Sequence, residues 1–446
     1  MSGKSLQEKI DEHASPLDML RNNRFGAWTF PMKPEFTNWR SEQAAWAKTA
    51  VVFDQGFHMY DINFRGPDLH RLLSDVAINS FDMFGKNKAK QMVVCNEDGY
   101  VIGDSILFGL DDEEASVVGG PIVSRWVEYQ AEIGDYDVEI TRDEMSLMNP
   151  DRKFFRWQLQ GPNALKVADK ASKGTLPEIG RFGMGEFTIA GRPVRALNHS
   201  MTRRMGLEIW GPAADGQAVL EALVAAGEEF GLLEAGGVAY STTALESGWY
   251  GINVPAIYSG ESMRPYREWV SAETPEGFGT IGGSYVPDTI DGHYITPWDT
   301  GYGQILNFDH DFIGRAALER LADRPHRKKV WLRWNDDDVI DVMRSSLFDD
   351  EATRAKFMGQ PYSVYSTFPA DAVYMNDELV GISTRVGYTV NVGSWSSLAM
   401  IDEERAVDGA EVSVLWGEPN GGTAKRSVER HAQRPVRAVV STTSLA

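Results

Sequence analysis

The sequence has a single cysteine, Cys95, among 446 residues, so no disulfide can form within the chain. Cys95 stands in the apolar stretch MVVCNEDG, where no electropositive neighbour would lower the pKa of its thiol. We interpret it as a small hydrophobic residue in a strand rather than a nucleophile. The GxSxG and P-loop motifs are also missing, which argues against a serine nucleophile elbow and a P-loop nucleotide site.

Long hydrophobic runs are missing as well. No stretch approaches the roughly 20 apolar residues that a membrane helix needs, and MSGKSLQEKIDEHASPLDML lacks the hydrophobic segment of a signal peptide. We therefore expect a cytoplasmic protein. Basic residues are few relative to acidic ones, and the formal net charge of -20 would repel phosphate backbones and anionic membranes. Neither nucleic acid nor a membrane is an expected partner.

Metal-binding and dinucleotide-binding patterns are not found. The eight histidines form no HxH or HExxH pair and have no cysteine partners, so no metal site is expected. The segment GFGTIG matches GxGxxG in letters, but SAETPE before it is not an apolar strand and SYVPDTIDG after it cannot open a long helix. Without a helix N-terminus to hold a pyrophosphate, we reject it as a nucleotide site.

The length and patterning predict several domains. A chain of 446 residues with 42% hydrophobic content can form two or three. Two segments share the order strand, Gly-Pro, helix: INFRGPDLHRLL and WQLQGPNALKVA, which indicates a weak internal duplication. From about residue 328 the sequence changes to short β-rich runs separated by turns. We predict an α+β fold of two related α/β subdomains (1–150 and 151–327) around a common site, with a C-terminal β-barrel (328–446).

Two features indicate a ligand site. The stretch 236–269 collects Tyr240, Glu246, Trp249, Tyr258, Tyr266 and Trp269 among glycines and prolines. We interpret it as the floor of a site, although a packed aromatic core is the alternative. The second feature is Asp104, in a strand that follows an expected hairpin turn at 97–99. Its carboxylate is either solvated at a strand end or held for a purpose, since burying it unpaired is costly.

Long strings throughout the chain carry a family resemblance. They include VVFDQGFHMYDI, NKAKQMVVCNEDGYVIGD, WQLQGP, GLEIWGP, AYSTTALESGW and FDHDFIGRAALE. These strings resemble the folate-dependent T-protein (aminomethyltransferase) of glycine cleavage, and within that family the aromatic O-demethylases that act on vanillate and syringate. The resemblance implies three domains around a central folate site. It also implies an enzyme that moves the methyl of a small methoxylated aromatic substrate to N5 of tetrahydrofolate, leaving a phenol.

The resemblance also implies roles for individual residues. Tyr240 matches a tyrosine important for methyl transfer, and His58 is the next donor that could assist the leaving phenoxide. The implied substrate-binding residues are Phe30, Gln55, His58, Met59 and Trp249. The implied tetrahydrofolate-binding residues are Asp104, Gln158, Glu208, Glu246 and Trp249. A carboxylate such as that of Glu208 can accept paired hydrogen bonds from the amino and ring N–H groups of a pterin.

One departure from the family bears on the substrate. Vanillate-type enzymes carry an arginine that holds the substrate carboxylate, and Gly120 stands at that point in VVGGPIVSRW. Losing a guanidinium removes a bidentate anchor. Either another group binds the carboxylate, or the substrate carries it elsewhere on the ring. We therefore place a 2-methoxybenzoate, such as dicamba, ahead of vanillate or syringate.

Three alternatives remain open. A glycine-cleavage aminomethyltransferase would act with a lipoyl carrier protein, but Tyr240 replaces the arginine expected there, so no lipoyl carrier protein is an expected partner. A sulfonium demethylase of the same fold would hold a small cation in an aromatic cage. A non-catalytic folate-binding accessory protein would carry a KGCY-type signature, which the sequence lacks.

Overall fold

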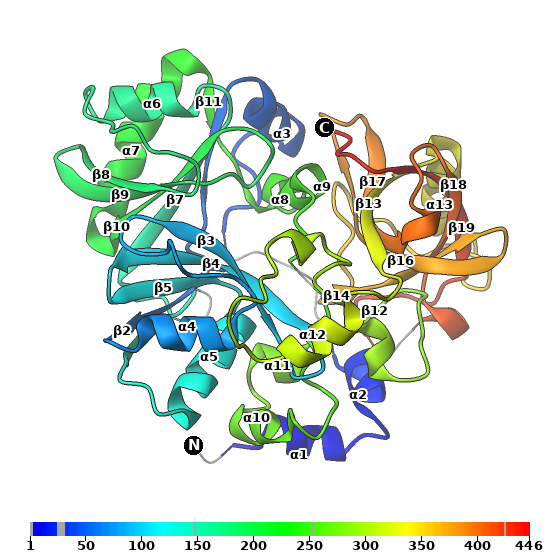
Figure 1. Ribbon diagram of the computed structural model, residues 1–446. Coiled ribbons are helices and arrows are strands. Elements are labelled where there is room, and N and C mark those ends of the chain that lie inside the picture. Colours follow the sequence, from blue (N-terminus) through cyan, green and yellow to red (C-terminus); the bar gives the residue numbers. More distant parts are fainter. Residues whose placement is uncertain (1–2, 25–31, 147–148, 252, 423–424) are drawn as a thin grey trace.

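The structure is a computed structural model that describes residues 3–24, 32–146, 149–251, 253–422 and 425–446. Figure 1 shows three β-structures side by side. The sheet that contains β7 and β10 lies at the upper left, the sheet that contains β3 and β4 lies nearer the centre, and a barrel lies on the right. No helix in the described ranges is long and apolar enough to cross a membrane.

The central sheet is antiparallel, with five strands in the order β3-β4-β5-β2-β6. Its strands are β2 (Tyr60–Arg65), β3 (Ala89–Cys95), β4 (Val101–Asp111), β5 (Glu114–Gly119) and β6 (Glu139–Asp143). Strands β3 and β4 form the expected hairpin. Helices α4 (Leu69–Val76) and α5 (Pro121–Ile133) bury apolar side chains against this sheet, among them Leu72 and Val127. Burial of this apolar face is what holds the helices on the sheet.

The second sheet has six strands in the order β11-β1-β7-β10-β9-β8. They are β1 (Ala50–Asp54), β7 (Phe154–Gln160), β8 (Met184–Ile189), β9 (Arg192–Asn198), β10 (Gly206–Pro212) and β11 (Leu232–Glu234), with α6 (Ala164–Ala171) and α7 (Gly216–Gly227) packed against them. Strand β1 comes early in the chain, yet it pairs with β7 on one side and β11 on the other. The sheets therefore do not divide at residue 150, because the apolar strand β1 is buried between two later strands. The domain limits themselves stay a prediction.

The two Gly-Pro corners have the same geometry. Gly66 follows β2 at a φ of 157° and Gly161 follows β7 at 120°. A Cβ at Gly66 would lie 2.1 Å from the Asp137 carbonyl oxygen, and one at Gly161 would lie 2.8 Å from that of Thr49. Both corners therefore require glycine, both for φ and for space. This shared strand–corner–helix unit agrees with the internal duplication.

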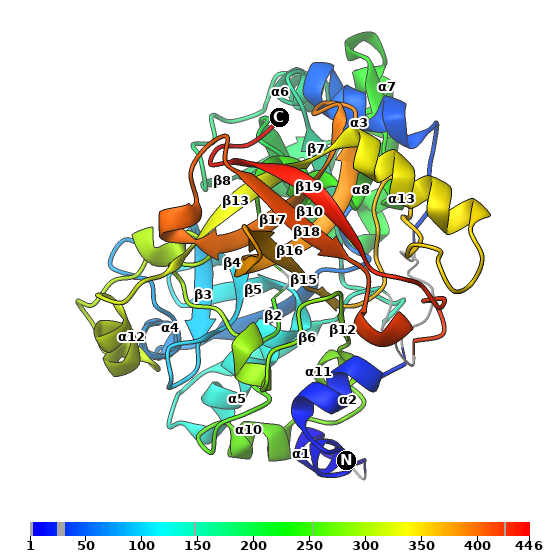
Figure 2. The ribbon, with the colours of Figure 1, turned by 90° about the vertical axis from the view of Figure 1, so that its right-hand side faces the viewer.

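The C-terminal strands close into a barrel in the order β13-β17-β16-β15-β18-β19, as the sequence predicts. They are β13 (Arg327–Trp334), β15 (Asp371–Met375), β16 (Glu378–Thr389), β17 (Ser394–Asp402), β18 (Glu411–Trp416) and β19 (Arg434–Ser441). Figure 2 faces this barrel, with α13 (Asp336–Phe348) along its side. Trp334 and Trp416 meet edge to face in its interior. Large apolar side chains thus fill the barrel, which leaves its outer wall to meet the two sheets.

Short elements join these parts. They are α1 (Leu6–Asp11), α2 (Pro16–Asn22), α3 (Trp39–Lys48), α8 (Gly237–Tyr240), α9 (Thr243–Ser247), α10 (Arg264–Trp269), α11 (Pro275–Phe278), β12 (Ile281–Gly282), α12 (Arg315–Leu321) and β14 (Phe368–Pro369). In GFGTIG, α11 ends at Phe278 and the two-residue strand β12 follows. No long helix begins there, so this segment offers no helix N-terminus for a pyrophosphate, as its sequence pattern predicted.

Candidate active site

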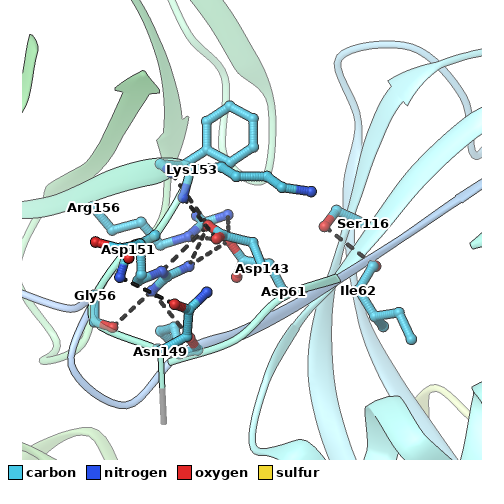
Figure 3. Close-up of polar contacts among 12 residues, drawn as sticks. Gly56, Asp61, Ile62, Ser116, Asp143, Asn149, Asp151, Lys153 and Arg156 are labelled. Atoms are coloured by element: carbon cyan, nitrogen blue, oxygen red, sulfur yellow. Dashed lines mark hydrogen bonds and ion pairs between the residues drawn. The ribbon is translucent and has the colours of Figure 1, made fainter. Parts of the chain in front are cut away.

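The turn between β1 and β2 carries Gln55, His58 and Met59 and connects the two sheets. Arg152 holds this turn, because its Nη1 donates to the carbonyl oxygens of Gly56 at 2.7 Å and Met59 at 3.1 Å. Figure 3 shows the contact at Gly56 beside the charged groups of Asp61, Asp143 and Arg156. The guanidinium of Arg152 therefore fixes the backbone conformation of this turn.

Those charged groups form a buried ion-pair network. Arg156 donates to Glu208 Oε1 at 2.6 Å and, through Nη2, to Asp61 Oδ2 at 3.0 Å. Arg152 donates to the same Asp61 oxygen at 2.9 Å and to Asp143 at 3.1 Å. Figure 3 shows Asp61, Asp143 and Arg156 converging from different strands. The network ties the central sheet to β7 and β10 and orients the Glu208 carboxylate.

Tyr240 and His58 form a direct pair. Tyr240 Oη lies 2.8 Å from His58 Nε2, and the Tyr240 ring meets Phe53 and Phe57 edge to face. Burial raises the pKa of Tyr240 and lowers the pKa of His58 to about 3. Both groups are therefore neutral at pH 7, and they share one hydrogen bond. His58 Nδ1 is buried and has no partner within the described ranges.

Gln55 lies in the turn after β1, and Gln158 and Glu208 lie on β7 and β10 of the six-stranded sheet. Gln158 pairs with Phe53 on strand β1 and with Glu208 on strand β10. The side chains of Phe53, Gln158 and Glu208 therefore lie on one face of the sheet. Gln55 Nε2 donates to Gln158 Oε1 at 3.1 Å, and Gln158 donates to the His199 carbonyl oxygen at 3.1 Å. Gln55 Oε1 is buried without a described partner, which leaves an acceptor for a ligand donor.

Asp104 is held within strand β4 and is 8% exposed, so it is not a solvated strand end. Its Oδ2 accepts hydrogen bonds from Trp249 Nε1 and Tyr302 Oη, both at 2.8 Å, and from Gln91. Burial raises the pKa of Asp104 even though the Trp249 and Tyr302 hydrogen bonds lower it. The carboxylate thereby fixes the Trp249 indole, which is 36% exposed and lies at the surface of the cluster.

Glu246 and Met59 make contacts that hold elements of the fold together. Glu246 accepts from Trp46 Nε1 at 3.0 Å and Asn391 Nδ2 at 2.9 Å, which joins α9 to α3 and to the barrel. Met59 packs against a cluster that includes Phe108 and Trp210. Phe30, the remaining predicted substrate contact, lies outside the described residues.

The aromatic stretch 236–269 divides between core and site. Tyr258 and Tyr266 are each 1% exposed and belong to the main hydrophobic core, with Trp269 packed against it. Tyr240 and Trp249 instead take part in polar contacts with His58 and Asp104. The core alternative is therefore correct for the end of the stretch. The beginning of the stretch, with Tyr240 and Trp249, lies in the candidate site.

Sequence reasoning missed Arg385, which lies in barrel strand β16 with its guanidinium 5.7 Å from the Trp249 ring centre. The signal was a lone arginine inside the barrel strand ELVGISTRVGYT. At Gly120 a Cβ would meet nothing within 4 Å, so the missing family arginine leaves open space. Arg125, one helical turn further on, pairs with Glu276 at 2.9 Å and does not take that place.

Cys95 is buried, and burial raises the pKa of its thiol. Its interpretation as a small hydrophobic residue is confirmed. Across the described ranges, no three His, Cys, Asp or Glu side chains gather in a way that could hold a metal ion.

Comparison with known proteins identifies the family. The family model described as GCVT N-terminal domain matches residues 19–253. A syringate O-demethylase from Sphingobium sp. is 46% identical over 98% of this chain and 95% of its own length. The chain belongs to the GCVT family. A sesamin methylene transferase from Sinomonas sp. is 32% identical over 83% of this chain and 81% of its own length.

More distant members agree. An aminomethyltransferase from Streptomyces coelicolor is 25% identical over 69% of the chain and 73% of that protein. The crystal structure of glycine cleavage system aminomethyltransferase T from Bartonella henselae superimposes with a TM-score of 0.63 at 17% identity, covering 99% of this chain and 97% of that one. This likeness confirms the predicted fold.

This GCVT-family chain is a methyl-transfer enzyme that uses tetrahydrofolate as its acceptor, as the resemblance implied. The residues present fit such a ligand. Gln55 Oε1 and His58 Nδ1 are buried polar atoms without described partners, and the oriented Glu208 carboxylate lies beside Gln158. A flat pterin with several N–H groups supplies the donors that these acceptors lack.

Proposed function

We propose that the enzyme demethylates a methoxybenzoate and produces a phenol and 5-methyltetrahydrofolate. The observation that carries this proposal is the neutral Tyr240–His58 pair, joined at 2.8 Å beside the unsatisfied Gln55 oxygen. In the reaction the methyl–oxygen bond breaks and a methyl–nitrogen bond forms. The ether oxygen keeps the bonding electron pair, and the proton displaced from N5 balances the proton that the phenol gains.

Tyr240 assists the leaving oxygen. Because burial raises its pKa, the phenol keeps its hydrogen and can donate it to the ether oxygen as negative charge develops there. In the His58 tautomer with hydrogen on Nε2, that N–H donates to Tyr240 Oη, so His58 does not compete with the substrate for the phenol hydrogen. In that tautomer Nδ1 carries a lone pair and no hydrogen. This suits its surroundings, because no described acceptor lies near Nδ1 to receive a hydrogen bond. His58 thus orients Tyr240.

The other predicted residues bind and orient. When bound, tetrahydrofolate supplies N5 as the nucleophile that accepts the methyl. Glu208 and Gln158 would hold the pterin edge, while the Asp104–Trp249 pair would wall the site near the reacting atoms. Held in line, donor and acceptor react as neighbours in one site rather than by chance encounter. Glu246 would act through its contacts to Trp46 and Asn391, by positioning α9.

Syringate is the first candidate substrate, because the relative with 46% identity over almost the full chain is a syringate O-demethylase. This relative reverses the order expected from the sequence. A 2-methoxybenzoate such as dicamba is the second candidate, on the observation that Gly120 leaves open space where vanillate-type enzymes have an arginine.

An anaerobic assay tests the proposal. The purified enzyme is incubated with tetrahydrofolate and with syringate, vanillate, 2-methoxybenzoate or dicamba, and both products are quantified. We expect one 5-methyltetrahydrofolate per phenol, with the same rate in the presence of a metal chelator. Phenol formed without tetrahydrofolate, or activity lost to chelator and restored by metal, would contradict the proposal. Turnover only with an aminomethylated lipoyl carrier would identify an aminomethyltransferase instead.

A further inference from the structure

Arg385 is a buried cation that forms no ion pair with a carboxylate of the described residues. The residue is 7% exposed, and its Nε and Nη2 have no hydrogen-bond partner within the described ranges. Its Nη1 makes a long hydrogen bond of 3.3 Å to Tyr362 Oη. Burying a guanidinium without an anion is costly. An anionic ligand that pairs with Arg385 would remove this cost.

Other buried arginines of the described chain differ in this respect. Arg125 pairs with Glu276, and Arg156 pairs with Asp61 and Glu208. Arg267 donates to Gln7 Oε1 and to three backbone carbonyl oxygens. These three guanidinium groups hold the fold together. The unpaired edge of Arg385 has no comparable structural use.

The backbone turns Arg385 toward the site. Arg385 has a φ of 53°, and the pairing of β16 with β17 shifts register between Thr384 and Gly387. A bulge of this kind redirects a side chain, and a non-glycine residue at positive φ costs free energy that functional sites often carry. The guanidinium lies 5.7 Å from the ring centre of Trp249, which Asp104 holds. Burial raises the pKa values of Asp104 and Tyr240, and the charge of Arg385 opposes that rise in both, so both are within its electrostatic reach.

The unpartnered atoms have the right geometry for a carboxylate. Nε and Nη2 form one edge of the guanidinium plane, and two parallel N–H groups on that edge bind both oxygens of a carboxylate. The same chain shows this arrangement at Arg437, where Nε donates to Asp338 Oδ2 at 2.9 Å and Nη2 to Oδ1 at 2.7 Å. In Arg385, no described residue offers an acceptor to the N–H groups of this edge.

We propose that Arg385 binds the carboxylate of the aromatic substrate, in place of the arginine that Gly120 replaces. The inference rests on the proposed function and adds its specificity: the substrate is a benzoate whose carboxylate is recognised from barrel strand β16, while Tyr240, which His58 orients, contacts the ether oxygen. Because Gly120 offers no side chain and Arg125 is paired, the described chain supplies this cation from β16.

The test compares an acid with its neutral analogue. We measure kcat and KM of the wild type and Arg385→Met with the preferred methoxybenzoate and with its carboxamide. We expect Arg385→Met to raise KM for the acid on the order of 10- to 100-fold, as for loss of a charged hydrogen-bonded pair, and to leave KM for the amide unchanged. Arg333→Met removes an exposed arginine from barrel strand β13, which does not pair with β16, and should change neither value.

Binding and stability provide independent measurements. Calorimetric titration with the free benzoate should show the same loss of affinity in Arg385→Met, whether or not turnover occurs. Removing an unpaired buried charge should leave the melting temperature of the ligand-free enzyme unchanged or higher. Arg385→Lys keeps the charge but lacks the two-donor edge, so it should bind the acid with intermediate affinity and serves if the Met variant fails to fold.

Three outcomes would overturn the inference. The first is an Arg385→Met enzyme that prefers the acid over the amide as strongly as the wild type does. The second is a variant with normal benzoate affinity but weakened tetrahydrofolate binding, which would assign Arg385 to the glutamate carboxylates of the folate. The third is a wild type that binds acid and amide equally. Failure of the proposed function differs from all three, since it would show as benzoate binding through Arg385 without any methyl transfer.

Discussion

At the scale of single residues, the candidate site contains neutral groups whose ionisation is suppressed by burial. Tyr240 and His58 both keep their neutral forms at pH 7, because burial raises the pKa of the phenol and lowers that of the imidazole. A neutral donor suits a reaction in which negative charge appears only as the methyl leaves. The sequence indicated both residues, but the 2.8 Å contact between them joins positions 182 apart in the chain.

Tyr240→Phe tests this role. The variant keeps the ring and its contacts with Phe53 and Phe57 but loses one hydrogen bond to developing charge. We expect kcat to fall on the order of a hundredfold, about 3 kcal/mol, with little change in KM. Tyr258→Phe is the matched control, since Tyr258 donates to the Glu276 carbonyl oxygen in the core. Equal kcat values for the two variants would make Tyr240 a packing residue.

At the scale of elements, the turn between β1 and β2 is held by Arg152, which belongs to the buried ion-pair network. Arg152 and Arg156 connect β2 and β6 of one sheet with β7 and β10 of the other through three carboxylates. The sequence predicted the strands and the Gly-Pro corners, because these follow from local pattern and turn chemistry. It did not predict the pairing of β1 with β7, since pairing depends on which distant strand can cover an apolar edge.

Arg156→Met tests the network. Removing one guanidinium leaves Asp61 and Glu208 buried with fewer partners, which should lower the free energy of unfolding by about 3 to 5 kcal/mol. Arg65→Met breaks an ion pair with Glu114 in which the arginine side chain is 65% exposed, and should cost less than about 1 kcal/mol. Urea unfolding measures both. A similar, small loss in each variant would show that the network contributes little.

At the scale of the whole molecule, the barrel meets the rest of the chain through further buried charges. Asp371, the first residue of β15, accepts a hydrogen bond from the Ser284 backbone N–H at 3.2 Å and is 2% exposed. Lys425 of the barrel domain donates to the carbonyl oxygen of Ile281 in β12. These contacts place titratable groups where the barrel and the connecting segments join.

Asp371 should make global stability depend on pH. Burial raises its pKa from 3.8 to about 7, so the folded state holds this proton more tightly than the unfolded state does. Its contribution is complete below pH 3.8 and is lost as pH rises to about 7. Asp371→Asn should therefore gain stability relative to the wild type across that range, on the order of 4 kcal/mol by pH 8.

Urea unfolding between pH 5 and 8 measures the difference between Asp371→Asn and the wild type. Asp377→Asn, an exposed position in the next turn of the barrel, should follow the wild type at every pH. A difference between Asp371→Asn and the wild type that does not change with pH would show that Asp371 is ionised throughout this range.

The sequence by itself determined the fold class, the closed C-terminal barrel and the family chemistry, because strand and turn patterns are local and long family strings survive in order along the chain. Only the tertiary structure decided how the site is assembled. Asp104 receives a hydrogen bond from Tyr302, 198 positions away, and Arg385 reaches Trp249 from barrel strand β16. A polar residue is read as paired or unpaired only when its surroundings are known, since the cost of burial depends on which distant groups the fold brings within hydrogen-bond distance.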